Sequence, residues 1–162
     1  MGRQSVIKDI FKNERVRSFV FWFTGLVLLD QIIKFVVFRF VSVARHVVLN
    51  EEQILGIQLL KNFDFAFSLR VPEPIIFLIY IVVLAVMLIY IKNNFRTFDA
   101  KSILAWTFIV SGAISNIVER VIFGYVKDFI YIVGGGIFNF ADFYILFGIA
   151  LLFYIEFRRE KL

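Results

Sequence analysis

The 162-residue chain contains no cysteine and a single histidine, His46, and these two shortages exclude several kinds of chemistry. Without cysteine there can be no disulfide, no thiol nucleophile and no thiolate metal site. A zinc peptidase of the H-E-x-x-H type needs two histidines, and a serine–histidine hydrolase would have to use His46. Any reaction must therefore run on carboxylates, amides, hydroxyls and basic groups. We expect neither a metal nor a cofactor.

Charge is also scarce. Charged residues make up 19% and hydrophobic residues 60% of the chain, and the mean hydropathy is +0.84. A soluble domain has about 25% charged residues and about 45–50% hydrophobic residues. A packed core in a chain this short cannot hide that much apolar surface, so much of it must face lipid. The composition predicts an integral membrane protein and excludes disordered, collagen-like and coiled-coil chains.

Four apolar stretches are long enough to cross a bilayer, which takes about 20 residues per helix. The first carries Asp30 and Lys34 and lacks a small-residue cleavage site, so we interpret it as a retained span and not as a signal peptide. We predict an all-α membrane protein, a four-transmembrane-helix bundle forming a single membrane domain over residues 1–162. The predicted spans cover about residues 18–41, 74–91, 100–123 and 138–157.

The positions of the basic residues predict the orientation. Eleven of the 18 lysines and arginines lie within 1–17, 92–101 and 158–161, which a four-span arrangement places on one side of the membrane. The positive-inside rule then puts both termini in the cytoplasm, with residues 1–17 as a basic extension. Outer loops cover about 42–73 and 124–137. Topology therefore accounts for the net charge of +5, and we expect no nucleic-acid partner.

The first outer loop has strand character. Residues 54–59 alternate in part, and Phe63, Phe65 and Phe67 continue the alternation. Such alternation is typical of a half-buried strand. We predict a small β-like subdomain on the extracytoplasmic membrane surface.

Charged residues inside membrane spans are functional candidates by default because they are costly there. Asp30 and Lys34 are four residues apart and lie on one helical face. Two interpretations stay open: an ion pair that fixes the first helix in the bundle, or a pair that grips a polar backbone or a lipid headgroup. At the end of the third span, Asn116, Glu119 and Arg120 can all point into the bundle.

Asp128 and Asp142 both map to the outer membrane surface, so the topology allows them to meet. No basic residue lies within one helical turn of Asp142, which therefore needs a distant partner or a proton. Two close carboxylates cannot both ionise cheaply, so they share a proton. The ionised member can activate water while the protonated member donates to a peptide carbonyl. This is the machinery of aspartyl proteolysis.

Five segments in this order resemble lipoprotein signal peptidase (signal peptidase II). The resemblance covers about residues 24–157. The patterns are D-Q-x-x-K at Asp30–Lys34, N-x-G-x-A-F at Asn62–Phe67, G-x-x-x-N-x-x-D-R at Gly112–Arg120, V-x-D-F at Val126–Phe129 and F-N-x-A-D at Phe138–Asp142. Asp64 stands at the family's glycine position and Glu119 at its aspartate position. We expect the glutamate to be tolerated and Asp64 to affect substrate preference.

The resemblance implies an aspartic endopeptidase of the bacterial plasma membrane. It would remove signal peptides from prolipoproteins, cleaving before a diacylglyceryl-modified cysteine at the outer membrane face. Its partners would be these substrates and membrane lipids, and we expect a monomer. Asp128 and Asp142 would be the catalytic pair. The positions that match site-shaping residues are Asn62, Asn116, Arg120, Asn139, Asp30 and Lys34.

Two other classes remain as alternatives. Intramembrane aspartates with lysine and arginine also build proton relays in transporters and channels. Against this, the polar residues cluster at one membrane face and leave no continuous path. A structural or assembly subunit is the other alternative, and the lack of a nearby partner for Asp142 counts against it.

Overall fold

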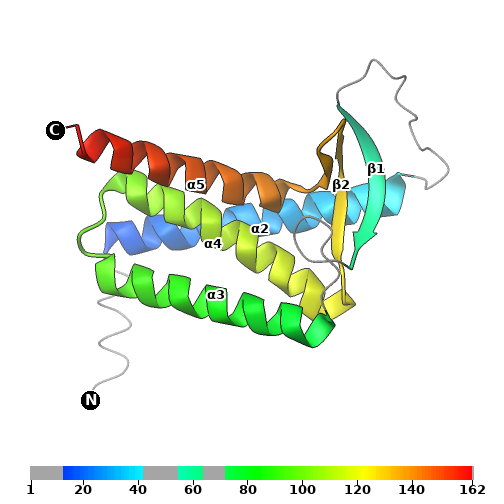
Figure 1. The fold of residues 1–162 in the computed structure, drawn as a ribbon, viewed down its shortest axis with the longest axis horizontal. Helices are drawn as coiled ribbons and strands as arrows, with labels where there is room; N and C mark the ends of the chain where they lie inside the picture. The colour runs from blue at the N-terminus through cyan, green and yellow to red at the C-terminus, as the bar shows by residue number, and fades with distance from the viewer. Residues whose placement is uncertain (1–12, 42–54, 64–71, 162) are drawn as a thin grey trace.

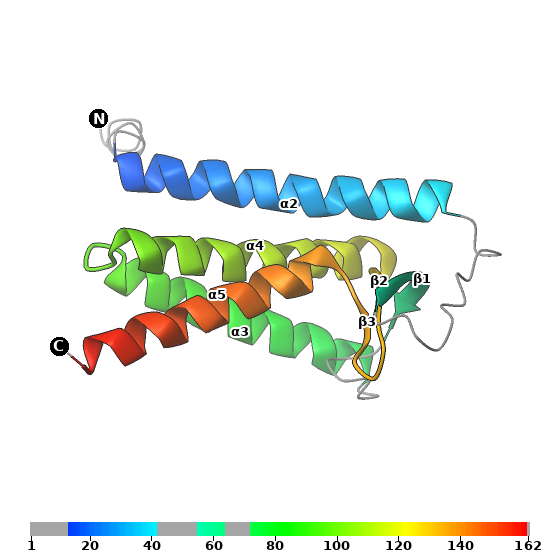
Figure 2. The ribbon, with the colours of Figure 1, turned by 90° about the horizontal axis from the view of Figure 1, so that it is seen from above.

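The computed structural model describes residues 13–41, 55–63 and 72–161. Long helices run side by side, and a small sheet lies at one end of them (Figure 1). The other end carries the start of the first helix, the end of the last helix and the α3–α4 connection (Figure 2). In chain order the elements are α2 (Glu14–Phe40), β1 (Leu55–Asn62), α3 (Glu73–Asn94), α4 (Ala100–Phe123), β2 (Val126–Ile132), β3 (Gly136–Phe138) and α5 (Phe140–Arg159).

Four helices of the described chain are long and apolar enough to cross a membrane. Large apolar side chains stand exposed on their outer faces, among them Phe21 and Phe35 of α2, Ile81 of α3 and Phe153 of α5. In water this exposure would be costly, whereas in lipid it is the expected outer surface. The prediction of a four-helix membrane bundle is thus confirmed.

Capping residues decide where the helices begin and end. Asn13 accepts a hydrogen bond from the Arg15 amide, so α2 begins at Glu14 and takes in the last residues of the predicted 1–17 extension. Asn139 caps α5, which therefore begins at Phe140 and not at 138. Gly124 ends α4 in the left-handed conformation with φ 76°, where glycine is favoured.

The helix α4 is the centre of the bundle and packs against α5 and α2. Two glycines allow α4 and α5 to approach backbone to backbone. A Cβ on Gly112 would collide with the Ala141 carbonyl, and one on Gly148 would lie 2.6 Å from the Ala105 carbonyl oxygen. Small residues at such crossings are the usual means of tight helix packing in membranes.

The helix α3 joins the bundle mainly near the end far from the sheet. The buried core there consists of Ile91, Phe98, Ile103 and Val110, and partly buried aromatic side chains surround it. α3 is therefore held near its C-terminal end, and Ile76 is also buried near its other end. Its exposed apolar side chains, such as Ile81, remain available to lipid.

The sheet is antiparallel with the order β1-β2-β3. Strand β1 coincides with the stretch whose alternation predicts a strand. Strands β2 and β3 cover most of the predicted outer loop of about 124–137, where the sequence analysis predicts no strands. Lys127 and Asp128 are adjacent polar residues, so the segment shows no clean alternation. Asp64, Phe65, Phe67 and His46 lie outside the described residues.

Candidate active site

The polar residues converge where the sheet meets the ends of α4 and α5. Asp128 comes from the middle of β2 and Asp142 from the first turn of α5. Asn62 ends β1, Asn116 lies in α4 and Asn139 caps α5. Segments far apart in the sequence are thus brought to one end of the bundle (Figure 1).

Asp128 is buried, with 2% of its surface exposed. Its Oδ1 accepts a hydrogen bond of 2.6 Å from the Asn139 amide, and its Oδ2 accepts one of 2.8 Å from the Asn62 amide. Burial raises the pKa of Asp128 to about 6, the two amide donors oppose the rise, and the charge of Asp142 adds to it. Asp128 can therefore gain and lose a proton near neutral pH.

Asp142 is held by a reciprocal helix cap. Its Oδ2 accepts a hydrogen bond of 3.0 Å from the Asn139 backbone N–H, and its own N–H donates to Asn139 Oδ1. Its Oδ1 accepts a further bond of 2.9 Å from the Asn116 amide. The positive end of the helix dipole also favours a carboxylate here. The distant partners that the sequence requires for Asp142 are amides.

Asn139 links the two carboxyl groups. Its side-chain amide donates to Asp128 and its backbone amide donates to Asp142. The same side-chain amide lies 3.2 Å from Asn116 Oδ1. A single fully buried residue thus fixes the relative position of Asp128 and Asp142.

A buried cluster of charged residues contacts Asn116 and fixes its orientation. Lys34 Nζ lies 2.9 Å from Asp30 Oδ2, 3.0 Å from Glu119 Oε2 and 2.9 Å from Asn116 Oδ1. Since Lys34 donates to the Asn116 oxygen, the Asn116 amide nitrogen is turned toward Asp142. Asp30 and Lys34 therefore form a buried pair whose link to Asp142 runs through Asn116.

Sequence reasoning missed three members of this cluster. Ser115 donates to Asp30 Oδ2 at 2.6 Å, and the Gln31 amide donates to Ser115 Oγ at 2.8 Å. Lys127 of β2 pairs with Glu119 Oε1 at 3.1 Å. Ser115 precedes Asn116 and is uncharged, so it gave no signal. Lys127 lies outside the predicted spans, where a charged side chain is not a functional candidate by itself.

Arg120 and Tyr80 form a second group. Arg120 is buried, and its guanidinium lies 5.4 Å from the centre of the Tyr80 ring on α3. Arg120 therefore points into the bundle and links α4 to α3. Tyr80 was also missed, because the second span looked uniformly apolar.

The chemistry available at this site is acid–base chemistry. Within residues 13–41, 55–63 and 72–161, no group of three histidine, cysteine or acidic residues is placed to hold a metal ion. The site offers two carboxyl groups in different surroundings, each fixed by amide donors. Such a pair can pass protons to and from a substrate.

The raised pKa of Asp128 predicts a pH dependence of stability. A carboxyl group with a higher pKa in the folded state stabilises the fold below its unfolded pKa of about 3.8, and this contribution is lost as the pH rises through about 6. Relative to Asp128→Asn, the wild type should therefore lose up to about 3 kcal/mol of unfolding free energy between pH 4 and pH 8. Unfolding midpoints in detergent across this range measure the difference.

Glu14→Gln is the matched control, because the Glu14 side chain is 90% exposed and pairs with Arg17, one turn along α2 at the far end of the bundle. Its midpoints should follow those of the wild type at each pH. Parallel curves for the wild type and Asp128→Asn would contradict the raised pKa.

Comparisons with known proteins match most of this chain. The sequence model of the signal peptidase (SPase) II family matches residues 22–158. The lipoprotein signal peptidase of Fusobacterium nucleatum is 31% identical over 148 residues, which is 88% of this chain and 89% of the relative. That of Streptococcus agalactiae is 29% identical over 144 residues, covering 84% of this chain and 89% of the relative.

Two solved structures share the fold. Both are bacterial membrane enzymes determined by the in meso method, at 2.3 and 1.9 Å resolution. The first has a TM-score of 0.74 at 23% identity and covers 87% of this chain and 88% of its own. The second has a TM-score of 0.71 at 22% identity and covers 85% and 91%. At these sequence identities the similarity shows a shared fold and nothing further.

Proposed function

The chain belongs to the signal peptidase II family of aspartic endopeptidases, which remove signal peptides from prolipoproteins, and from this membership we propose that Asp128 and Asp142 carry out the cleavage. The observation that carries the proposal is the double donation from Asn139 to both carboxyl groups. It holds them together in different surroundings, as a shared-proton pair requires.

The geometry suggests a division of roles. Asp142 lies at a helix N-terminus and accepts two N–H donors, so it acts as the carboxylate that takes a proton from the attacking water. Asp128, more deeply buried, carries the shared proton and donates it to the carbonyl oxygen of the scissile peptide. As the tetrahedral intermediate collapses, Asp142 passes its proton to the leaving amine, and Asp128 recovers its own from the hydroxyl.

The substrate we propose is a prolipoprotein that carries a diacylglyceryl group on the cysteine after the cleavage site. The site lies at one end of a bundle whose outer faces are apolar, so a lipid anchored in the bilayer can bring the peptide bond to it. We also propose a monomer as the active form. Membrane lipids would surround the helices.

Purified protein should convert a diacylglyceryl-modified prolipoprotein into a shortened product that begins at the modified cysteine. The measurement is the intact mass of the product. The same prolipoprotein without the diacylglyceryl group is the control and should stay uncut, because nothing would hold its peptide at the membrane surface. Equal cleavage of both forms would contradict the proposed substrate class, and cleavage of neither would contradict the proposed function.

We propose that the site faces the outer side of the bacterial plasma membrane, with both termini in the cytoplasm. Within the described residues, most lysines and arginines lie at the start of α2, in and beside the α3–α4 connection, and at the end of α5. These segments lie at the bundle end opposite the sheet (Figure 1), which supports this orientation. A topology reporter after Leu162 or near Asn94 should then report cytoplasm, and one near Glu51 should report the outer side. A cytoplasmic signal at Glu51 would overturn the orientation.

Family membership removes the support for the transporter and assembly-subunit alternatives. The Glu119 departure also has a physical explanation. Its two carboxylate oxygens reach Lys34 in α2 and Lys127 in β2. We propose that Glu119 replaces the family's aspartate in this role, because its ion pairs connect α2 to the sheet.

A further inference from the structure

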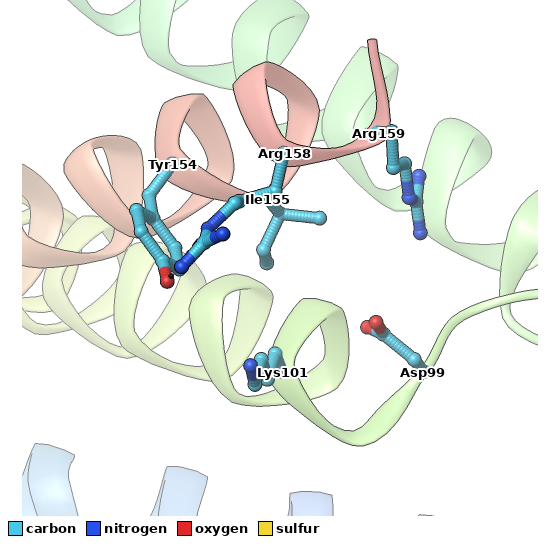
Figure 3. A pocket seen from close by; sticks show the side chains of 6 residues that line it. All are labelled: Asp99, Lys101, Tyr154, Ile155, Arg158 and Arg159. Atoms are coloured by element: carbon cyan, nitrogen blue, oxygen red, sulfur yellow. Dashed lines mark hydrogen bonds between the residues drawn. The ribbon is translucent and has the colours of Figure 1, made fainter. Parts of the chain in front are cut away.

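The bundle end opposite the proposed active site carries a hollow of about 330 Å³. It lies between the start of α4 and the end of α5, and side chains of both helices reach toward it (Figure 3). The residues that line it are Asp99, Lys101, Tyr154, Ile155, Arg158 and Arg159.

The lining carries three cationic groups and one carboxylate, so it is net positive. The carboxylate is already engaged, since Asp99 caps α4 and accepts a hydrogen bond of 2.7 Å from the Ser102 amide. Arg159 lies 3.7 Å from Glu156, but both side chains are more than half exposed. An exposed pair of this kind is weak and leaves Arg159 able to bind another anion.

Arg158 is oriented before any ligand arrives. Its Nε donates to the Tyr154 hydroxyl at 3.2 Å, and its guanidinium lies 5.7 Å from the centre of the Tyr154 ring (Figure 3). The bond uses one of the five N–H donors of the guanidinium. The remaining donors form the planar fork that suits the oxygens of a phosphate group.

The ends of membrane-spanning helices come to the depth of the lipid headgroups, and the hollow is formed at two such ends. It is built from the first residues of one membrane-spanning helix and the last residues of another. Ile155 forms an apolar part of its wall, and Leu104 and Phe153 are exposed one turn or less toward the bilayer centre. Basic hollows between spans at the cytoplasmic side are suited to anionic headgroups.

We propose that this hollow binds the phosphate group of an anionic phospholipid, with Arg158, Arg159 and Lys101 contacting the phosphate oxygens. The acyl chains would run along the exposed apolar side chains of α4 and α5. The chemistry that is recognised is a phosphate anion. The membrane position of the hollow favours a lipid over free phosphate as its source.

Native mass spectrometry of the full chain in detergent tests the proposal, with phosphatidylglycerol and phosphatidylcholine of identical acyl chains as probes. The wild type should bind the first phosphatidylglycerol roughly 10-fold more tightly than phosphatidylcholine, because the choline cation of phosphatidylcholine offsets the charge of its phosphate group and is repelled by the basic lining. The double variant Arg158→Gln, Arg159→Gln should lose this preference, since each basic residue near a lipid surface contributes a several-fold gain. Lys101→Gln alone should lose part of it.

The matched control is Lys92→Gln with Arg96→Gln, which removes two charges at the same bundle end but outside the hollow. It should keep the preference. Equal loss in this control would show a general charge effect and overturn the site. So would equal binding of both lipids by the wild type. If inorganic phosphate at the same concentration displaces phosphatidylglycerol, the lipid assignment is wrong.

Discussion

Asp128→Asn and Asp142→Asn should each lower kcat/KM for a diacylglyceryl-modified prolipoprotein by roughly 10³-fold or more while the protein stays folded. Asparagine keeps the size and much of the hydrogen bonding of aspartate but cannot exchange a proton. General acid and general base steps each contribute about 10²–10⁴-fold. One variant removes the base and the other removes the acid. Turnover by mass spectrometry, with unfolding midpoints measured in parallel, gives the result.

The losses should be far from additive, because the two carboxyl groups act as one unit. The double variant should be about as inactive as either single variant. The wild-type rate should also show a bell-shaped pH dependence with two apparent pKa values that belong to the pair. Glu14→Gln, at the far end of α2, should keep full activity. Near-normal turnover by either asparagine variant would disprove the aspartyl mechanism.

Lys34→Met should produce the largest loss of stability. It removes the cation that pairs with both Asp30 and Glu119, which are fully buried. Breaking a buried charge pair by removing one partner costs about 3–5 kcal/mol, because an uncompensated charge is left behind. Activity should fall as well, since Lys34 orients the Asn116 amide that binds Asp142. The unfolding midpoint and the fraction of folded protein in detergent measure the effect.

Adding Asp30→Asn to Lys34→Met should recover much of the stability. Charge balance is then restored, because Glu119 still pairs with Lys127. If the double variant is no more stable than Lys34→Met, charge balance is not what holds this cluster. If it is both stable and fully active, the pair fixes the helix and has no part in orienting the site.

The helices and the placement of Asp128 and Asp142 at one end of the bundle could be predicted from the sequence. The first follows from the length of the apolar runs, and the second follows from the order of the four spans. An apolar run of 20 residues has few alternatives to a membrane span. Once four spans are set, topology alone puts both aspartates on one face. The sequence also indicated that Asp142 needs a distant partner, although not that the partners would be the amides of Asn116 and Asn139.

Strand β2 and the roles of Tyr80 and Ser115 could not be predicted, because they depend on contacts between residues far apart in the sequence. Strand β2 was missed because adjacent Lys127 and Asp128 break the alternation, and both are explained only by their partners in α4 and β1. The aromatic ring of Tyr80 is typical of a lipid-facing residue until Arg120 is seen beside it. Residues with a single polar atom, such as Ser115, give no signal until their partners are known.

Because of the reciprocal cap between Asn139 and Asp142, the Asp142 carboxylate has both a structural and a proposed chemical role. The group that starts α5 is also the group proposed to activate water, so the first turn of this helix cannot be improved for stability without changing the chemistry. Fraying of that turn would release Asp142 from the Asn139 backbone while the four helices remain packed. Heat should therefore inactivate this protein before it unfolds. Sequence changes that strengthen other helix ends would raise the unfolding temperature but leave the temperature of inactivation where it is.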